Sequence, residues 1–588
     1  MKRILLSAAA FVLLIIGLSA SLIVSAEGAN QGAPTLVQPT LVPTVDAGVG
    51  DALPSESAIA RIVRDGKVRV GLLYNNPPFG ELNIRGEVSG FDADLARSMA
   101  DAWGVTFEPV QVTRLTAIDA VKSGMVDMLV ASQVHQRELG SDVEFSETYY
   151  AGSQSILVRP DDGAASPADM ANRKIGVVMG TPSETALVAW QARTQIPITV
   201  QTYLTIDQAF AALLNSEVDG IVDTRVQLTR IQSTPGLAKI LDEGIASEPY
   251  AVVFRRQDVN WRNLINKTVQ YIVQKGQMQE IQNANFPGTK YPISLVPLWA
   301  GLGTDAPKPD QFGQDIPYPA QYAIPRIQAA GVVRVAGVTD VPADGPDSDK
   351  RLDALNRAVM DAMAARWGVR VEYIPNSAAN AADLVAGGQA DMAIGAPLDW
   401  NVTDRVDLSE PYLLHGQRLM VKQDSEFETF TDLRGKWVGI FASEPGMADQ
   451  VNALADSVKS KVDIFTVVRD QDAASYMLVE NNADVVFGDS LKLIPQLEAN
   501  PGLLRITTRG DAPDPWYTRI YVGAAVPRND LDFRLLVDYT LQELARDGTL
   551  NGLLGPVMQP QDIPPFDIWP GSSNYLGIQL DNTNVLVG

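Results

Sequence analysis

The chain has no cysteine and only two histidines among its 588 residues. Without cysteine it can form no disulfide, no thiolate nucleophile and no thiolate-bound metal site. The two histidines, His135 and His415, are too few and too far apart in sequence to suggest a metal site built from imidazoles. A carboxylate site would be the alternative, but no loop has the aspartate spacing of a calcium site. We therefore expect no metal and no other cofactor.

Basic residues are also scarce relative to acidic ones. Lysine and arginine total 47, aspartate and glutamate total 70, and the formal net charge is -23. Binding of nucleic acid requires basic patches that neutralise phosphates, so this balance argues against a nucleic-acid partner. The hydrophobic content of 46% is ordinary for a soluble globular protein. At ~150 residues per domain, the length predicts about four compact units.

The N-terminus has the pattern of an export signal. Lys2 and Arg3 precede an apolar run over residues 4–24, and Val24-Ser25-Ala26 resembles a cleavage site. The run also approaches the ~20 residues that span a bilayer. Residues 1–26 are therefore predicted to be either a signal peptide or an N-terminal membrane anchor. In both cases the rest of the chain lies outside the cytoplasm, secreted or anchored to the outer face of the membrane.

Residues 27–55 are rich in proline, threonine and glycine, as in the stretch APTLVQPTLVPTV. Prolines at this density favour an extended backbone without internal hydrogen bonds. We interpret this segment as a spacer between the membrane side and the globular part. A lipid-anchored form is excluded, because lipid attachment there needs a cysteine.

The body of the chain is a tandem duplication. Short motifs recur at a shift of 263 to 265 residues, and their matched positions are Trp103 with Trp367, Gly124 with Gly388, Asp127 with Asp391, Ser146 with Ser409, Tyr149 with Tyr412, and Asp219 with Asp484. This period is far too long for a solenoid unit, so each copy is a whole pair of lobes. We place copy one at residues 56–286, a linker at 287–322, copy two at 323–555 and a tail at 556–588, which we expect to wrap onto copy two.

Within each copy, short apolar runs alternate with helical patterns. Residues 68–73 and 105–112 read as strands, and between them Leu95, Met99 and Trp103 are spaced four apart, as on one face of a helix. This alternation predicts βαβ units, a mainly parallel sheet and an α/β fold. A second series begins near Lys174, so each copy should hold two lobes. In copy one, lobe 1 covers about 60–158 and 250–286, and lobe 2 covers about 159–249.

An ordered set of motifs in copy one resembles solute-binding protein family 3, the extracytoplasmic amino-acid-binding proteins of ABC transporters. The matching stretches are YNNPPFG (74–80), GEVSGFDADLARSMA (86–100), AIDAVKSGMVDMLVAS (117–132), QRELGSDVEFSETYYAGSQSILVR (136–159), ADMANRKIGVVMGTPSE (168–184) and VDGIVDT (218–224). The resemblance implies a two-lobed periplasmic-binding-protein (venus-flytrap, type II) fold, here in tandem, with ligand held between the lobes.

The resemblance also implies a set of ligand-binding residues in lobe 1. Arg137 stands where the family places an arginine for the ligand carboxylate, which a guanidinium can bind with two parallel hydrogen bonds. Ser132 matches a hydroxyl position near the same carboxylate. Asn76 and Phe79 lie on the loop that packs against the ligand side chain. Arg137 could instead be a surface arginine paired with Glu138.

Lobe 2 should supply the remaining contacts. Thr181 and Ser183 begin a helix after a strand, and such a helix start offers free N–H groups and a favourable dipole to an anion. Asp223 matches the acidic residue that binds the ligand ammonium, although its spacing from Asp219 is one residue short of the family pattern. Arg114 lies about one helical turn before Ala117, where relatives specific for acidic amino acids carry an arginine.

Several other conspicuous residues are expected to be structural. Asp127 is expected to end a helix–strand turn, and Phe91 and Trp103 to lie in the core. Tyr149 and Tyr150 should pack near the hinge.

Copy two departs from the pattern. It aligns Val402 with the carboxylate-binding arginine, and Arg405 is the nearest alternative. Asp489 keeps the family spacing from Asp484. We expect copy two to fold like copy one and to have lost or changed its ligand chemistry.

The sequence is compatible with three functions. The first is a receptor that delivers an amino-acid-like solute to an ABC permease. The second is a sensor or scaffold that works through a membrane partner. The third is an enzyme resembling cyclohexadienyl (prephenate or arogenate) dehydratases, for which Glu184 or Asp223 would be the candidate acid. No catalytic triad or phosphate loop is present, so the sequence favours a binding protein over an enzyme.

Overall fold

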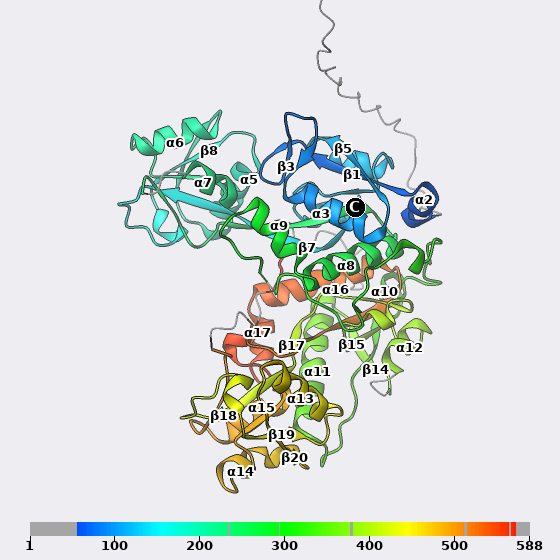
Figure 1. Cartoon of the computed structure of the whole chain (residues 1–588). Helices are drawn as coiled ribbons and strands as arrows, with labels where there is room; N and C mark the ends of the chain where they lie inside the picture. Colours follow the sequence, from blue (N-terminus) through cyan, green and yellow to red (C-terminus); the bar gives the residue numbers. More distant parts are fainter. Residues whose placement is uncertain are drawn as a thin grey trace, which may run out of the picture. The chain divides into compact units, whose positions relative to one another are not determined.

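The computed structural model describes residues 56–571, except 233–235, 293, 377–379, 511–513 and 564–565 (Figure 1). The predicted segments 1–26 and 27–55, and residues 572–588 of the tail, lie outside the described residues. Among the described residues, no helix has both the length and the apolar character needed to cross a membrane. All of them belong to one compact unit, 49–588.

Copy one contains eight α-helices among the described residues, namely α2 (Ala58–Asp65), α3 (Phe91–Trp103), α4 (Ala117–Lys122), α5 (Pro182–Thr194), α6 (Ile206–Leu214), α7 (Arg225–Ile231), α8 (Val259–Gln274) and α9 (Gln277–Asn285). Its strands are β1 (Lys67–Leu73), β2 (Asn75–Asn76), β3 (Gly80–Leu82), β4 (Val88–Ser89), β5 (Thr106–Val112), β6 (Met128–Leu129), β7 (Val143–Val158), β8 (Lys174–Val178), β9 (Thr199–Tyr203), β10 (Gly220–Thr224), β11 (Lys239–Ile240) and β12 (Ala246–Arg255).

The predicted helix over the Leu95–Trp103 stripe is α3. Its spaced apolar positions are fully buried or nearly so, which accounts for its packing against the sheet. It ends at Gly104, whose φ of 72° is a left-handed conformation that glycine adopts without strain. Phe91 and Trp103 are core residues, as predicted.

One sheet runs through both lobes of copy one. Its strand order is β5-β1-β6-β12-β7-β10-β8-β9, with β11 paired to β7. The β1–β5 and β8–β9 pairs are parallel, whereas β7 pairs antiparallel with β12 and with β10. The predicted parallel pairing therefore holds toward the two edges of the sheet, where β1–β6 and β10–β8 are parallel as well, and it fails in the middle. The reason is that β7 and β12 pass directly between the lobes, and direct crossings in opposite directions bring antiparallel strands into the middle of the sheet.

Copy two has the helices α10 (Ala323–Ala330), α11 (Asp347–Trp367), α12 (Ala381–Ala386), α13 (Met447–Ser457), α14 (Ala473–Leu478), α15 (Ser490–Ala499), α16 (Leu531–Arg546) and α17 (Thr549–Leu554). Its strands are β13 (Val332–Ala336), β14 (Arg370–Tyr373), β15 (Met392–Pro397), β16 (Val406–Leu408), β17 (Leu413–His415), β18 (Gln417–Lys422), β19 (Trp437–Phe441), β20 (Asp463–Val467), β21 (Val485–Asp489), β22 (Leu504–Ile506) and β23 (Ile520–Pro527).

The lobes of copy two have separate sheets. One follows the order β14-β13-β15-β23-β16, with β17 paired to β23, and the other follows β20-β19-β21-β18-β22. The counterpart of the long strand β7 is interrupted between β16 and β17. Pro411, which lacks a backbone N–H, stands there in place of Thr148. A second interruption follows at Gly416.

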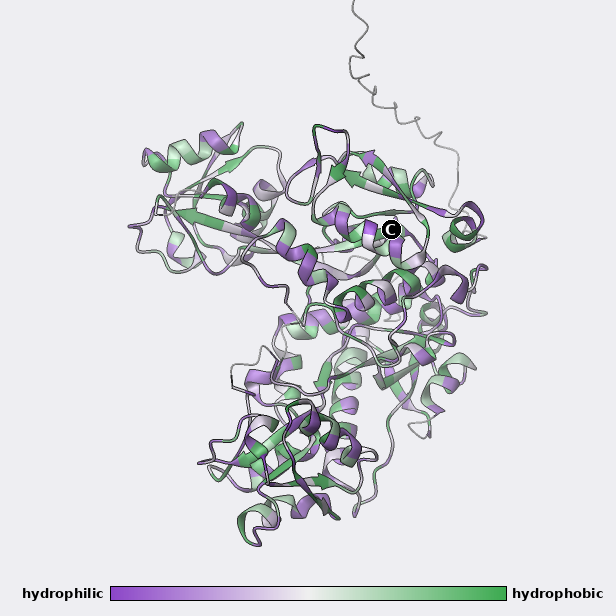
Figure 2. Cartoon of the chain, in the orientation of Figure 1, coloured by the Kyte–Doolittle hydropathy of each residue, from purple (hydrophilic) through white to green (hydrophobic). Residues whose placement is uncertain are grey.

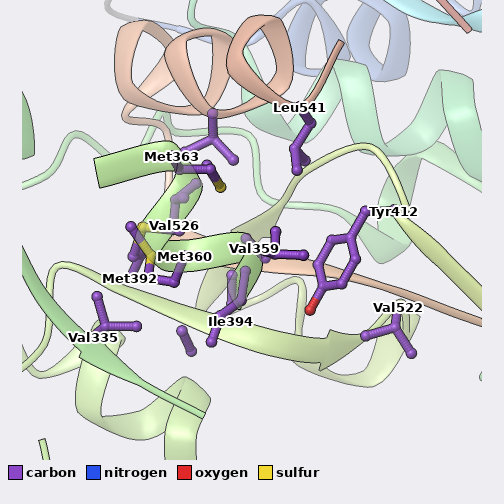
Figure 3. Packing of buried hydrophobic residues seen from close by; sticks show 14 of the residues in the cluster. Val335, Val359, Met360, Met363, Met392, Ile394, Tyr412, Val522, Val526 and Leu541 are labelled. Carbon is purple, nitrogen blue, oxygen red and sulfur yellow. The ribbon is translucent and has the colours of Figure 1, made fainter. Parts of the chain in front are cut away.

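The duplicated motifs make equivalent contacts in both copies. Trp103 donates its indole N–H to Thr268 at 2.8 Å, and Trp367 donates to Thr540 at 2.8 Å. The carboxylates of Asp127 and Asp391 each accept a backbone N–H from the first strand of their copy and pair with arginines. Asp127 is thus structural, as predicted. Figure 3 shows the core of copy two, where Tyr412, the counterpart of Tyr149, packs among aliphatic and methionine side chains.

The strands of both copies are mainly hydrophobic, while the helices carry one hydrophobic and one polar side (Figure 2). This pattern agrees with the burial of the strands and of one stripe along each long helix. It is the distribution expected where helices cover both faces of a sheet.

The two copies meet through α8 and α16. Arg262 of α8 pairs with Glu144 of its own copy at 3.1 Å and with Asp407 of copy two at 2.7 Å. Arg534 of α16 pairs with the same Glu144 at 3.0 Å and with Asp538 at 3.2 Å. All five side chains are nearly excluded from solvent, so these ion pairs join the copies through a buried network.

Two tryptophans of the connecting segments bridge the copies reciprocally. Trp299, in the linker after copy one, stacks on Trp400 of copy two at 4.6 Å. Trp569, in the tail after copy two, stacks on His135 of copy one at 3.6 Å and also packs against Tyr539 of copy two. We define residues 291–302 and 556–571 as the two straps. The tail therefore contacts both copies and not copy two alone.

Candidate functional site

A polar network lies in lobe 1 of copy one, where the predicted residues Asn76 and Ser132 come together. Ser132 donates to Asp92 at 2.6 Å and accepts from Asn76 at 3.1 Å. Tyr149 donates to the other oxygen of Asp92 at 2.7 Å. Asp92 is buried, and burial raises its pKa to about 6 in spite of these hydrogen bonds. Asp92 thus fixes the position of Ser132.

The second group of polar residues lies on β10 of lobe 2 and on β12, which passes between the lobes. Asp223 is the penultimate residue of β10, and its carboxylate is held by the backbone N–H of Thr224 at 2.7 Å and by the hydroxyl of Ser183. Glu248 of β12 accepts from Gln154 at 2.7 Å and from Tyr250 at 3.2 Å. Burial, with a further contribution from Glu248, raises the pKa of Asp223 to about 6. The two acidic side chains therefore lie within electrostatic range of each other.

Arg114 connects these two groups. Its guanidinium donates to Asn76 at 3.4 Å, and its charge lowers the pKa of both Asp92 and Glu248 relative to burial alone. Across the lobes, Arg230 of α7 donates to the Pro77 carbonyl at 3.2 Å. Side chains from both lobes and from the hinge strand β12 are thus gathered around one region. In it, the charge of Arg114 acts on two acidic side chains, Asp92 and Glu248.

Arg137 is placed differently from its prediction. Its side chain is completely buried against copy two, where it donates to Glu543 at 2.7 Å and to Gln542 at 2.8 Å and lies 4.8 Å from the ring centre of Tyr539. A guanidinium that is bound to these groups is not available to a ligand carboxylate between the lobes. We therefore remove Arg137 from the candidate site. It is also not a surface arginine paired with Glu138.

Phe79 and Thr181 also have structural partners. Phe79 is 4% exposed and makes edge-to-face contacts with Tyr150, Tyr250 and Phe286 within an aromatic cluster of lobe 1. Tyr150 belongs to the same packing, as predicted for the hinge. Thr181 caps α5 by accepting the N–H of Glu184.

The start of α5 is partly filled by its own helix. The carboxylate of Glu184 accepts the N–H of Gly180 at 2.7 Å, so one donor of the predicted anion site is already used. An acidic side chain at this place repels a second anion. Among the lobe 2 predictions, Asp223 and Ser183 keep positions suited to a ligand.

Copy two separates the two residues predicted there. The carboxylate of Asp489 forms a hydrogen bond with His415 Nδ1 at 2.7 Å, and it caps α15 by accepting the backbone N–H of Leu491. Arg405 forms an ion pair with Asp383 on the surface. In place of Asp92, copy two has Asn356, which accepts the hydroxyl of Tyr412 at 2.7 Å. Copy two therefore keeps the hydrogen bond from the tyrosine hydroxyl, but its acceptor is a neutral amide where copy one has a carboxyl group.

Sequence reasoning missed a charged group beside Asp489. Glu444 accepts the backbone N–H of Asp489 at 3.1 Å, and burial raises its pKa to about 7. Lys492 donates to Asp470 at 2.9 Å nearby. Glu444 precedes a helix in FASEPGM, where copy one has Thr181, and this replacement was the available signal. Glu248 of copy one gave no motif signal at all. In the described part of the chain, no three acidic or histidine side chains are placed to hold a metal ion.

Comparisons with known proteins agree with the duplication. The model of the bacterial extracellular solute-binding proteins, family 3, matches residues 68–288 and again 336–555. A glutamine-binding protein of Geobacillus stearothermophilus is 25% identical over 216 residues, 36% of this chain and 81% of the relative. An arginine-binding protein of Corynebacterium glutamicum is 23% identical over 241 residues, 40% of this chain and 76% of the relative. A solved ancestral arginine-binding protein bound to glutamine is 29% identical with a TM-score of 0.31, and the match covers 38% of this chain and 98% of that one.

Proposed function

The chain belongs to the bacterial extracellular solute-binding proteins of family 3, and from this premise we propose that copy one binds a small α-amino acid between its lobes. We further propose that it delivers this ligand to an ABC permease on the outer side of the cytoplasmic membrane. The chain would reach that side by its N-terminal segment, which would tether it to the membrane if uncleaved. The names of its relatives support the class of ligand.

The observation that carries the proposal is the gathering of complementary groups from both lobes of copy one. Arg114 and Asn76 together offer donors to a carboxylate, and a guanidinium suits that group because it can donate two parallel bonds. Asp223 and Glu248 offer acceptors and negative charge to an ammonium. A zwitterionic amino acid carries both groups close together. Ligand contact with both lobes would also favour their closure.

Copy two serves in this proposal as a partner of copy one that does not bind an α-amino acid. It has Asn356 in place of Asp92, and its Asp489 is paired with His415. Its buried contacts with copy one suit a scaffold. A sensor that works through a membrane partner would use the same ligand site. It would differ from a transport receptor only in the membrane protein that recognises the ligand-bound form.

The enzyme alternative receives less support. Glu184 caps its own helix, and this leaves Asp223 as the acid for a dehydratase-like reaction. The curated relatives named above are binding proteins. We propose that the chain binds its ligand without turnover, which an assay of prephenate consumption tests directly.

The test of the binding proposal is a thermal-shift screen of the common amino acids on the full chain, run on the wild type and on Asp223→Asn. A ligand at a hundred times its dissociation constant should stabilise the wild type by ~2.7 kcal/mol. The shift should disappear in Asp223→Asn and persist in the control Asp207→Asn, an exposed aspartate of the same lobe. No shift with any α-amino acid, or an equal shift in Asp223→Asn, would contradict the proposal.

A further inference from the structure

The junction between the copies contains a partly open cavity that the amino-acid site does not use. It has a volume of about 160 Å³ and is lined by both copies and by both straps. Glu147 of β7 and Glu410, which lies between β16 and β17, line it from equivalent positions of the repeat. A cavity of this size holds one molecule of about six non-hydrogen atoms, since ~150 Å³ accommodates benzene.

Acidic side chains outnumber basic ones in the described part of the cavity wall. Five of its lining residues are acidic and two are arginines. The two arginines, Arg262 and Arg534, are already engaged in the ion pairs with Glu144, Asp407 and Asp538. The remaining three acidic side chains, those of Glu147, Glu410 and Asp567, therefore face the cavity without an arginine of the wall bound to them.

These three carboxylates have neutral hydrogen-bond donors. Glu147 accepts from Gln270 at 2.9 Å, and Glu410 accepts from Gln542 at 2.7 Å. Asp567 accepts from Thr148 at 2.6 Å. Burial raises the pKa of all three, to about 8 for Glu147, although the charge of Arg137 offsets part of this effect at Glu410. Neutral donors do not compensate the charge of a buried carboxylate, so these groups favour the protonated form until a cation takes the place of the proton.

A second feature of the wall also suits a ligand that donates hydrogen bonds. His135 lines the cavity, is 3% exposed and has no hydrogen-bond partner for Nδ1 among the described residues. Burial holds the pKa of its ring well below the usual range, so the ring is neutral and one of its nitrogens is an acceptor. The His135 ring is stacked on Phe145 and on Trp569, and these two contacts fix it in place.

We infer that the cavity between the copies is a binding site for a small organic ammonium ion, held by Glu147 and Glu410 and shielded by the straps. The charge of the ligand compensates the carboxylates, and its N–H groups supply donors to them and to His135. The aromatic walls favour an alkylammonium over a hydrated metal ion. This inference does not depend on the proposed amino-acid function, because the residues of the two sites are different.

Calorimetric titration of the full chain with ethylammonium chloride at pH 7.5, with potassium chloride as the salt control, tests the inference. We expect saturable binding of one ion per chain. Because the pKa of Glu147 is about 8, a cation bound beside it should displace a proton. The heat of binding should therefore change with the ionisation enthalpy of the buffer. This readout requires no variant.

The matched variants are Glu147→Gln and Asp207→Asn. Glu147→Gln keeps the shape of the side chain, and it should weaken ethylammonium binding at least tenfold and remove most of the proton release. Asp207→Asn, at an exposed aspartate outside both sites, should change neither. Absence of saturable binding by the folded wild type would overturn the inference. So would binding that Glu147→Gln leaves unchanged, or that Asp207→Asn weakens equally.

Discussion

At the scale of single residues, the repeated tryptophan contacts show how much a short motif determines. In both copies the helix after the first strand ends in a tryptophan whose indole N–H reaches a threonine of a helix near the end of the copy. Each threonine hydroxyl also donates to a carbonyl one turn earlier in its own helix. The threonines are buried, so each hydroxyl satisfies a buried indole donor.

Replacement of Thr268 by valine therefore tests this contact. The substitution keeps the shape and leaves the N–H of Trp103 without an acceptor, so we expect a loss of about 1–3 kcal/mol in the free energy of unfolding. Urea denaturation measures this loss. Thr229→Val, at an exposed threonine of α7, should change stability by less than about 0.5 kcal/mol. Equal effects of the two variants would contradict the role given to Thr268.

Asp92 predicts a dependence of stability on pH. Burial raises the pKa of Asp92 in the folded protein to about 6, above the ordinary value of 3.8 for an aspartate. The folded state therefore binds the proton more tightly, and stability falls as pH rises from about 4 to about 6 and is level above that. The Asp92→Asn variant lacks this group, and copy two already has Asn356 at the same contact. We expect the variant to fold and to lose this part of the pH dependence.

Chemical denaturation of the wild type and of Asp92→Asn between pH 4 and pH 7 measures the difference. The stability of the variant relative to the wild type should increase as pH rises through this window, by up to about 3 kcal/mol for a shift of this size. A constant difference at all pH values would show that Asp92 does not titrate in the folded protein as described.

The limits of prediction from sequence are also clearest for single residues. Ser132 and Asn76 lie on local motifs near the ends of strands, and the structure brings them into contact; their role in binding stays a prediction. The prediction failed for Arg137 because its partners, Glu543 and Gln542, are more than four hundred residues away. No local pattern distinguishes a guanidinium buried against another domain from one that faces a ligand. Glu248 was missed for the same reason, since only the pairing of β12 with β7 brings it near Asp223.

At the scale of elements, the repeats and the βαβ pattern were sufficient to predict the α/β character of both copies and several elements of copy one. The helix α3 and the strands β1, β5 and β8 lie where apolar periodicity placed them. The direction of the central strands was not predictable, because the antiparallel pairing of β7 with β12 depends on how the chain crosses between lobes. The straps were read only as proline-rich connections, since stacking partners across copies leave no periodic signal.

The strap formed by the tail gives a prediction at this scale. Trp569 is 5% exposed and is packed against His135 and Tyr539. Trp569→Ala should lower the stability of the full chain by about 3–5 kcal/mol, because it leaves a large void in a packed junction. Trp437→Ala, at a tryptophan that is 47% exposed in β19, is the matched control. Differential scanning calorimetry of both variants makes the comparison, and similar small shifts would contradict the packing role of the strap.

At the scale of the whole molecule, the buried ion pairs between α8 and α16 make the two copies one unit. Arg262 contacts acidic residues of both copies, so Arg262→Gln leaves the buried carboxylate of Asp407 without its paired arginine and that of Glu144 with Arg534 alone. We expect a loss of about 3–5 kcal/mol. Arg366→Gln, which removes a solvent-exposed ion pair with Asp547, should cost at most about 1 kcal/mol. Guanidinium chloride unfolding distinguishes these outcomes, and a loss below 1 kcal/mol for Arg262→Gln would contradict the network.

The two copies have different side chains at matching positions. Copy one has Asp92 where copy two has Asn356, and Asp489 of copy two is paired with His415. The junction holds lobe 1 of copy one firmly, and its lobe 2 is joined through β7 and β12. Ligand binding between the lobes of copy one is therefore the central claim.

The most direct test of that claim is isothermal titration calorimetry of the full chain with the amino acid that stabilises it most. We predict a stoichiometry of one amino acid per chain, with binding abolished by Asp223→Asn and unchanged by Asp489→Asn. A stoichiometry of two, or binding that is lost in Asp489→Asn and kept in Asp223→Asn, would contradict the account.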